Sequence, residues 1–116
     1  MASYQARRAR GRFGEDLAVR EYQRRGYTVA GRNWRTTIGE LDLIVQMENT
    51  VVFVEVKARA SDRFGRPELA VGAAKQRRIR RLAAAWLRAH DARRATVRFD
   101  VVAVTGGRIE MFIDAF

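Results

Sequence analysis

The stretch from residue 38 to residue 57 constrains the fold more than any other part of the chain. It reads IGELDLIVQM over 38–47 and VVFVEVK over 51–57, and both runs are rich in the β-branched and large aliphatic residues that favour strands. Between the runs lie the polar residues Glu48 and Asn49, which are typical of a tight turn. The stretch therefore predicts a β-hairpin.

The length of that turn decides which side chains lie opposite one another. A turn of two residues (48–49) or of four residues (47–50) pairs Asp42 with Glu55 across the hairpin. The same register pairs Glu40 with Lys57, whereas a turn of three residues would pair Asp42 with Val56. An even-length turn also gathers the aliphatic side chains on one face: Leu41, Leu43, Val45, Val52, Val54 and Val56. Core packing and the acidic pairing thus favour the same register.

The rest of the chain predicts two helices and three further strands. Residues 11–25 predict a helix, with Phe13, Leu17, Ala18 and Tyr22 on its apolar side and Gly26 as its end, and a strand follows over 27–34. Residues 58–70 combine charges, Gly65 and Pro67 without a period and predict a loop.

A second helix is predicted over 71–90, where apolar residues recur at helical spacing. Two strands follow over 96–104 and 108–113, with a turn at Gly106 and Gly107. The order α-β-β-β-α-β-β predicts an α/β fold with a mixed central sheet flanked by helices, in which the strands at 51–57 and 96–104 run parallel. With 116 residues, 47% of them hydrophobic, we expect a single domain over residues 1–116.

Charge is distributed unevenly along a chain whose net charge is +10. Residues 1–35 carry nine basic and three acidic side chains and residues 58–95 carry eleven and three, whereas residues 36–57 carry one basic and four acidic. The basic flanks predict a polyanionic partner, with nucleic acid favoured over ribosomes and anionic lipids. An acidic island between them is the arrangement expected of a metal-holding centre on a phosphate-binding surface.

Several classes of protein are excluded or disfavoured by composition. No apolar run approaches the ~18 residues of a membrane span, so we expect no membrane association. The basic N-terminal residues are not followed by the apolar segment of a signal peptide, so we expect a cytoplasmic location. Because the chain has no cysteine and one histidine, it holds neither a thiolate site nor a multi-histidine zinc site.

The paired strands predict an acidic cluster formed by Glu40, Asp42 and Glu55 beside Lys57. Two carboxylates ~5 Å apart at an effective dielectric constant of ~20 repel by about 3 kcal/mol, and one divalent cation would balance the residual charge. Carboxylate oxygens without histidine or cysteine favour Mg²⁺ or Mn²⁺. The alternative is a cross-strand ladder of salt bridges without metal.

Lysine is scarce in this chain, which has 21 arginines and only two lysines, Lys57 and Lys75. A lysine where arginine is the usual cation indicates chemistry that needs a compact ammonium with an adjustable pKa. Such a group can orient or deprotonate a water molecule, and we assign that role to Lys57.

Asp42 followed by Glu55-Val56-Lys57 resembles the PD-(D/E)-x-K nuclease motif of type II restriction enzymes and archaeal Holliday-junction resolvases. More widely, the chain resembles the bacterial YraN-like family in six ordered segments: GEDLA (14–18), GYTV (26–29), GELDLI (39–44), VFVEVK (52–57), KQRRI (75–79) and RFDVV (98–102). The resemblance implies a restriction-endonuclease-like fold. Leu41 stands where that superfamily has proline, which leaves the role of Glu40 open.

The resemblance also implies a metal site. Asp42 and Glu55 would be the side-chain ligands, with the Val56 carbonyl as a further ligand and Lys57 placing the attacking water. Glu15 matches the helical glutamate that completes the site in resolvase-like nucleases, although an acid near the start of a helix also has a plain structural explanation.

Two further polar residues have open roles. Gln76 lies near the start of the second helix and is a candidate for contact with the scissile phosphate, the alternative being an exposed glutamine. Asp100 either extends the site or pairs with a neighbouring arginine.

The basic residues predict how nucleic acid would be held. Contacts to backbone phosphates position a nucleic acid without reading its sequence. The candidates are Arg7, Arg8, Arg10, Arg12, Arg59, Arg63, Arg66, Arg77, Arg78, Arg80 and Arg81.

The function that we expect is a Mg²⁺- or Mn²⁺-dependent endonuclease acting on DNA, with branched or junction DNA as one candidate substrate and a homodimer as one candidate assembly. A non-catalytic nucleic-acid-binding protein and an RNA-processing or ribosome-linked partner remain as alternatives.

Overall fold

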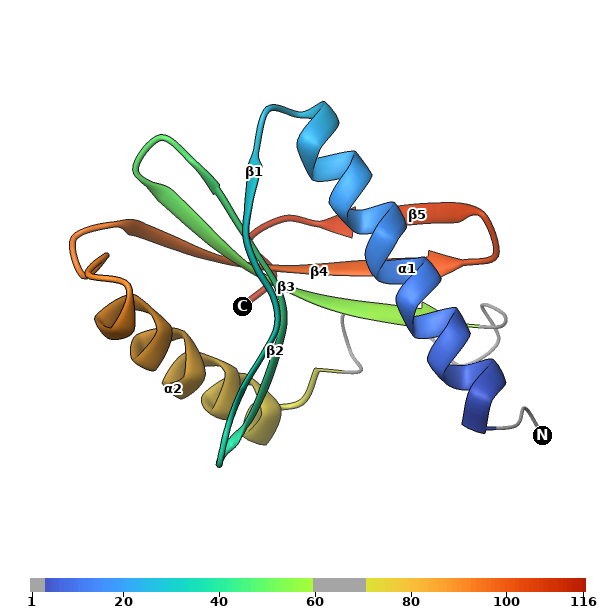
Figure 1. Cartoon of the computed structure of the whole chain (residues 1–116), viewed down its shortest axis with the longest axis horizontal. Coiled ribbons are helices and arrows are strands. Elements are labelled where there is room, and N and C mark those ends of the chain that lie inside the picture. Colours follow the sequence, from blue (N-terminus) through green and yellow to red (C-terminus); the bar gives the residue numbers. More distant parts are fainter. Residues whose placement is uncertain (1–3, 60–70) are drawn as a thin grey trace.

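The computed structural model describes residues 4–59 and 71–116, with side chains from residue 9 onward (Figure 1). The order of elements is the predicted one, α-β-β-β-α-β-β. Their bounds are α1 Tyr4–Arg24, β1 Thr28–Thr36, β2 Gly39–Met47, β3 Thr50–Arg59, α2 Ala73–Ala89, β4 Thr96–Thr105 and β5 Arg108–Phe112.

The five strands form one mixed sheet in the order β1-β2-β3-β4-β5. β3 and β4 run parallel and are connected through α2, whereas every other neighbouring pair is antiparallel. This confirms the predicted mixed sheet and the parallel pair. Glu48 and Asn49 form a two-residue turn, and the first pair beyond it is Met47 with Thr50, so the even-length register is also confirmed.

A helix covers each face of the sheet (Figure 1). We call the two layers of buried side chains the α1-side core and the α2-side core. The α1-side core contains Ala18, Tyr22, Leu43, Val45, Val52, Val54, Val102 and Val104. The α2-side core contains Leu41, Ile44, Val51, Phe53, Val71, Ile79, Leu82, Ala83, Trp86, Phe99 and Val101.

Strand β3 is buried on both faces because its side chains alternate between the two cores. Val52 and Val54 belong to the α1-side core, whereas Val51 and Phe53 belong to the α2-side core. Burial of each such side chain contributes roughly 1.5–3 kcal/mol. By the same alternation, Glu55 and Lys57 lie on the α2 side of the sheet, directly after the buried residues Val51 and Phe53.

The sheet splits between β2 and β3. Their pairing runs from the turn to Leu43 opposite Val54 and ends there. β2 continues with β1 as far as Gly39, and β3 continues with β4 as far as Arg59. Figure 1 shows the hairpin end of β1 and β2 projecting downward, away from β3 and β4, which continue to the right. We call this divergence the strand split, and Asp42 and Glu55 are the first residues beyond the last pair.

The strand split corrects two details of the predicted hairpin. Leu41 lies in the α2-side core and not with Leu43 on the other face, because β2 turns away together with β1. Glu40 pairs with Arg35 of β1, both as strand neighbours and through its side chain, and not with Lys57. Of the predicted acidic cluster and its neighbouring lysine, Asp42, Glu55 and Lys57 therefore remain together, without Glu40.

Helix α1 begins earlier than predicted and buries a shorter apolar side. Its contact with the sheet includes Gly14, where a Cβ atom would lie 3.1 Å from the Cβ atom of Ala58. Ala18 and Tyr22 are buried as predicted, but Phe13 is 49% exposed. Phe13 was wrongly assigned to the core because successive residues of a helix point about 100° apart, so the residue before Gly14 is directed away from the sheet.

Within residues 4–59 and 71–116, neither helix has a stretch long and apolar enough to cross a membrane.

Candidate active site

Asp42 and Glu55 meet at the strand split, where β2 and β3 no longer share backbone hydrogen bonds. Oδ2 of Asp42 accepts a hydrogen bond from the backbone N–H of Val56, at 2.9 Å. The side chain thus takes the place that a β2 carbonyl would occupy in a continued ladder. This contact fixes the Asp42 carboxyl group beside that of Glu55, which is buried.

The same hydrogen bond shows where the Val56 carbonyl points. The N–H and C=O groups of one strand residue point to the same side of the strand. Because the Val56 N–H faces Asp42, the Val56 carbonyl also faces β2, beyond the last β2–β3 pair. Two carboxyl groups and one carbonyl oxygen are therefore directed into the strand split.

The site places two carboxyl groups against each other at a partly buried position. Burial and the neighbouring Glu55 carboxylate raise the pKa of Asp42 to about 7, against the lowering effect of the Val56 N–H. The charge of Glu15 raises it further. A carboxyl group that still holds a proton near neutral pH is typical of functional sites, where like charges are held together by the fold.

Both lysines of the chain reach this site. Nζ of Lys75, in the first turn of α2, lies 2.5 Å from Oε1 of Glu55. Burial opposes the charge on Lys75, but its contacts with Glu55 outweigh burial and raise its pKa. Burial and the adjacent Lys75 ammonium lower the pKa of Lys57. Lys57 was predicted to act here and Lys75 was not, although the scarcity of lysine pointed to both.

Glu15 approaches the site from α1 but is held by β1. Its Oε1 accepts hydrogen bonds from Asn33 at 3.2 Å and from Arg32 at 3.4 Å. Its charge reaches Asp42, as the pKa of Asp42 shows. In the described part of the chain, no three acidic or histidine side chains lie close enough together to hold a metal ion. The acidic donors at the strand split are therefore Asp42 and Glu55.

Gln76 fixes the start of α2. Its Nε2 donates a hydrogen bond to the Val71 carbonyl at 2.9 Å, and its backbone N–H donates to the Gly72 carbonyl at 2.9 Å. Gln76 lies beside Lys75 and thus near the site, but in this structure its amide nitrogen serves the helix start. Its predicted contact with a phosphate remains a prediction.

The predicted nucleic-acid-binding arginines lie on several surfaces. Arg63, Arg66 and the side chains of Arg7 and Arg8 are outside the described residues. Arg12 is exposed on α1, and Arg77, Arg78 and Arg81 are exposed on α2.

Arg10, Arg59 and Arg80 have identified surroundings. Arg10 and Arg59 line a hollow of about 290 Å³ together with the exposed Phe13. The Arg80 guanidinium instead lies 4.7 Å from the centre of the Phe99 ring.

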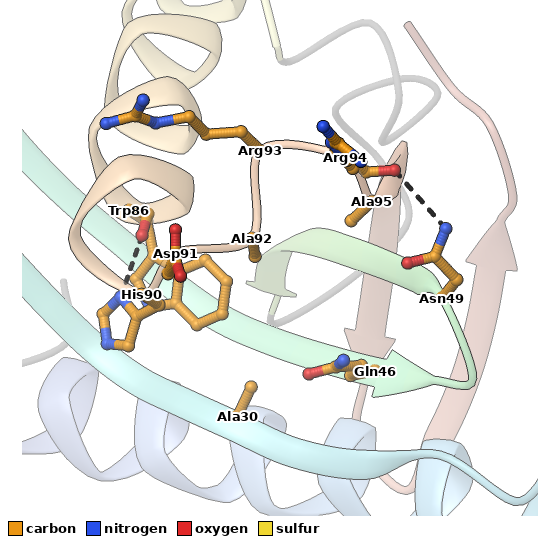
Figure 2. Close-up of a pocket in the computed structure, with 10 residues that line it drawn as sticks. All are labelled: Ala30, Gln46, Asn49, Trp86, His90, Asp91, Ala92, Arg93, Arg94 and Ala95. Carbon is orange, nitrogen blue, oxygen red and sulfur yellow. Dashed lines mark hydrogen bonds between the residues drawn. The ribbon is translucent and has the colours of Figure 1, made fainter.

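A larger hollow, of about 750 Å³, lies at the other end of α2 (Figure 2). Its lining includes Trp86, His90 and Asn49, whose Nδ2 donates a hydrogen bond to the Arg94 carbonyl at 3.4 Å. Lys75 and Gln76 are in the first turn of the helix, whereas His90 caps its last turn. This hollow is therefore separate from the strand split.

Asp100 belongs to the opposite side of the sheet and pairs with arginine. It is fully buried and accepts hydrogen bonds from the Tyr22 hydroxyl at 2.7 Å, from Nε and Nη2 of Arg98 at 2.9 Å each and from the backbone N–H of Asp114 at 2.9 Å. Its strand neighbours Val102 and Val104 lie in the α1-side core. The arginine-pairing alternative predicted for Asp100 is thus confirmed.

Comparison with known sequences places the chain in a family. The profile described as "Uncharacterised protein family UPF0102" matches residues 14–104. The chain belongs to the UPF0102 family. This confirms the resemblance to YraN-like proteins, and the match contains every element of the strand split and α2.

Relatives within the UPF0102 family cover most of the chain. A UPF0102 protein of Beutenbergia cavernae is 52% identical over 99 residues, which are 85% of this chain and 84% of the relative. One from Frankia casuarinae is 49% identical over 100 residues, 86% of this chain and 85% of the relative. One from Syntrophus aciditrophicus is 43% identical over 110 residues, 91% of this chain and 87% of the relative.

Proposed function

We propose that this UPF0102 protein is a metal-dependent endonuclease that hydrolyses phosphodiester bonds of DNA, with a restriction-endonuclease-like arrangement of its site. The observation that carries the proposal is the meeting of Asp42, Glu55 and both lysines at the strand split. A purely structural hairpin has no need of two carboxyl groups in contact at a partly buried position, because their repulsion opposes folding.

The donor set fits a hard divalent cation. Asp42 and Glu55 offer carboxylate oxygens, and the Val56 carbonyl faces the same side of β3. Mg²⁺ is usually bound through one or two carboxylates and keeps several water molecules, so a third acidic ligand is not required. The raised pKa of Asp42 is compatible with such a site, since burial and the neighbouring Glu55 disfavour a charged carboxylate that a bound cation would stabilise. Mn²⁺ suits the same oxygen ligands.

Each residue has a role that follows from its position. A divalent cation, when bound, would supply an activated water and stabilise charge on the phosphate. The Val56 N–H holds the Asp42 carboxyl group in place, and Glu55 provides the second carboxylate. Lys57 has a lowered pKa, so at a given pH a larger fraction of its amine is neutral than in an ordinary lysine, and only the neutral amine can accept a proton from water.

The basic surface supports a nucleic-acid substrate. Arg77, Arg78 and Arg81 extend along the exposed side of α2 from the turn that carries Lys75. Arg59 lies two residues beyond Lys57 on β3 and lines a hollow with the exposed Phe13. An exposed aromatic ring between cationic side chains is suited to stacking on a base while arginines contact phosphates. Cytoplasmic location and homodimer formation stay predictions.

One observation favours the alternative of a non-catalytic nucleic-acid-binding protein. The ion pair between Lys75 and Glu55 neutralises part of the acidic charge without a metal. In that alternative the site is a structural network and the arginines alone act on nucleic acid. The two functions differ in whether divalent cations bind at Asp42.

Cleavage by the purified protein tests the proposal. We expect Mg²⁺-dependent cleavage of a supercoiled plasmid or of a four-way DNA junction, and a loss of roughly 10³-fold in Asp42→Asn, because that change removes a ligand and leaves the fold intact. Glu110→Gln, an exposed acid on β5, is the control and should cleave as the wild type does. Cleavage that persists in Asp42→Asn rejects this site. Binding without cleavage of DNA or RNA supports the non-catalytic alternative.

A further inference from the structure

Lys75 links the start of α2 to the acidic pair at the strand split. Its Nζ lies 2.5 Å from Oε1 of Glu55, and the two side chains are 32% and 9% exposed. Glu55 is thus nearly enclosed, whereas Lys75 keeps access to solvent. An ion pair with one enclosed partner and one partly exposed partner can open by movement of the exposed side chain.

The position of Lys75 is set by packing. Val71, four residues before it, is buried in the α2-side core, and Gln76 donates its side-chain hydrogen bond to the Val71 carbonyl. Ile79, four residues after Lys75, is buried in the same core. The first turn of α2 is therefore anchored on both sides of Lys75, which directs its side chain to the strand split.

The ammonium group of Lys75 uses an oxygen atom that a metal ion would need. Glu55 is one of the two acidic donors at the strand split, and the other, Asp42, is in contact with it. A divalent cation bound between them would bring two positive charges close to the ammonium groups of Lys75 and Lys57. Lys57 already has a neighbour of like charge, because Lys75 is, after burial, the main cause of its lowered pKa. Repulsion between the cation and these ammonium groups therefore opposes simultaneous contact of Glu55 with Lys75 and with a metal ion.

We propose that Lys75 is a resident counter-ion, which neutralises Glu55 in the metal-free protein and is displaced when a divalent cation binds Asp42 and Glu55. This rests on the proposed function, because it requires a cation site at the strand split. Lys75 acts through Glu55 and is therefore a positioning residue. It keeps the Glu55 carboxylate ordered in the absence of metal, and it lowers the affinity for metal because the ion pair must open first.

Removal of Lys75 should therefore tighten metal binding. We expect Lys75→Met to bind Mn²⁺ roughly tenfold more tightly than the wild type, in a titration followed by the electron paramagnetic resonance signal of free Mn²⁺. The control is Arg88→Met, which removes one positive charge from the exposed last turn of the same helix, far from Glu55. Arg88→Met should bind Mn²⁺ as the wild type does, which separates the local ion pair from net charge.

Thermal unfolding gives a second measurement that does not depend on activity. Without metal, Lys75→Met should unfold at a lower temperature than the wild type, because Glu55 loses its partner. Excess Mn²⁺ should raise the unfolding temperature of Lys75→Met by more than that of the wild type, since tighter binding to the native state stabilises it more. If Lys75→Met does not fold, Lys75→Gln keeps a polar side chain of similar length and allows the same comparison.

The outcomes separate this proposal from the proposed function. If Asp42→Asn abolishes Mn²⁺ binding and Lys75→Met binds no more tightly than the wild type, the counter-ion role is overturned and the metal site stands. If neither the wild type nor Lys75→Met binds Mn²⁺ in an Asp42-dependent way, both proposals are overturned. If Mn²⁺ binding depends on Asp42 and is tighter in Lys75→Met but not in Arg88→Met, both proposals are supported.

Discussion

Two aspartates on opposite faces of the same sheet have contrasting surroundings. Asp100 on β4 accepts four hydrogen bonds, two of them from Arg98, so its negative charge is fully compensated within the fold. Asp42 on β2 accepts a hydrogen bond from Val56 and lies against the carboxylate of Glu55. The first arrangement stabilises the fold. The second opposes folding, which is why we attribute it to binding and chemistry.

The contrast also reflects the pairing of the strands. Asp100 lies where β4 is paired with β3, and Tyr22 of α1 covers it with a hydroxyl donor. Asp42 lies where β2 has left β3, so no further ladder hydrogen bonds join the two strands there. A split between strands therefore gives acidic side chains and a backbone carbonyl access to the same space. Continuous pairing would have used that carbonyl for the ladder.

The largest expected effect comes from truncating Asp100. Asp100→Ala leaves the Arg98 guanidinium and the Tyr22 hydroxyl without their buried partner, so the free energy of unfolding should fall by about 3–5 kcal/mol. Asp42→Ala should leave it within about 1 kcal/mol of the wild type, because relief of repulsion offsets the lost contact with Val56. Urea denaturation of both variants in metal-free buffer measures the difference. Equal losses in the free energy of unfolding would show that both aspartates stabilise the fold to the same extent.

The next effect, at most comparable in size, is expected from pH. Because Asp42 binds its proton more tightly in the folded chain, where its pKa is raised to about 7, than in the unfolded chain, folding takes up a proton between about pH 4 and pH 7. The free energy of unfolding should therefore decrease by up to about 4 kcal/mol as pH rises through this window in metal-free buffer, since each pKa unit corresponds to about 1.4 kcal/mol.

Asp42→Asn is the control for that prediction, since asparagine does not titrate. The decrease assigned to Asp42 is the difference between the two denaturation profiles. A wild-type profile parallel to that of Asp42→Asn would show that Asp42 titrates as an ordinary exposed aspartate, and the contrast with Asp100 would be lost.

The smallest effect concerns the arginines outside both aspartate centres. Arg77→Ala removes one exposed cation from α2, two residues after Lys75, so DNA affinity should fall about threefold and the salt dependence of binding should lose about one counterion. Fluorescence anisotropy with a labelled duplex at several salt concentrations measures both. Arg88→Ala, at the far end of α2, should change neither. If Arg88→Ala lost more DNA affinity than Arg77→Ala, DNA would bind nearer to the hollow of Figure 2.

Sequence reasoning predicted the hairpin, its register and the mixed sheet because each depends on local signals. The polar turn at Glu48 and Asn49 and the alternation of Val51 to Val54 determine the pairing next to the turn. The same alternation cannot show where pairing stops, so it misplaced Glu40 and Leu41, which follow β1 away from β3.

The contact of Lys75 with Glu55 is a second feature that sequence reasoning did not predict. This contact joins residues 20 positions apart, and it depends on how α2 packs on the sheet. The arginine partner of Asp100 was predictable because Arg98 lies two residues away on the same strand face. The buried hydroxyl of Tyr22, from α1, was not, because only the tertiary fold brings it to β4.

The central claim is that Asp42 and Glu55 share one divalent cation at the strand split. Anomalous diffraction from a Mn²⁺-soaked crystal tests it most directly, independently of substrate and activity. We expect one strong peak about 2.1 Å from an oxygen atom of each carboxylate, with the Lys75 ammonium withdrawn from Glu55. A crystal in which Mn²⁺ lies elsewhere, while Lys75 still contacts Glu55, would contradict the account.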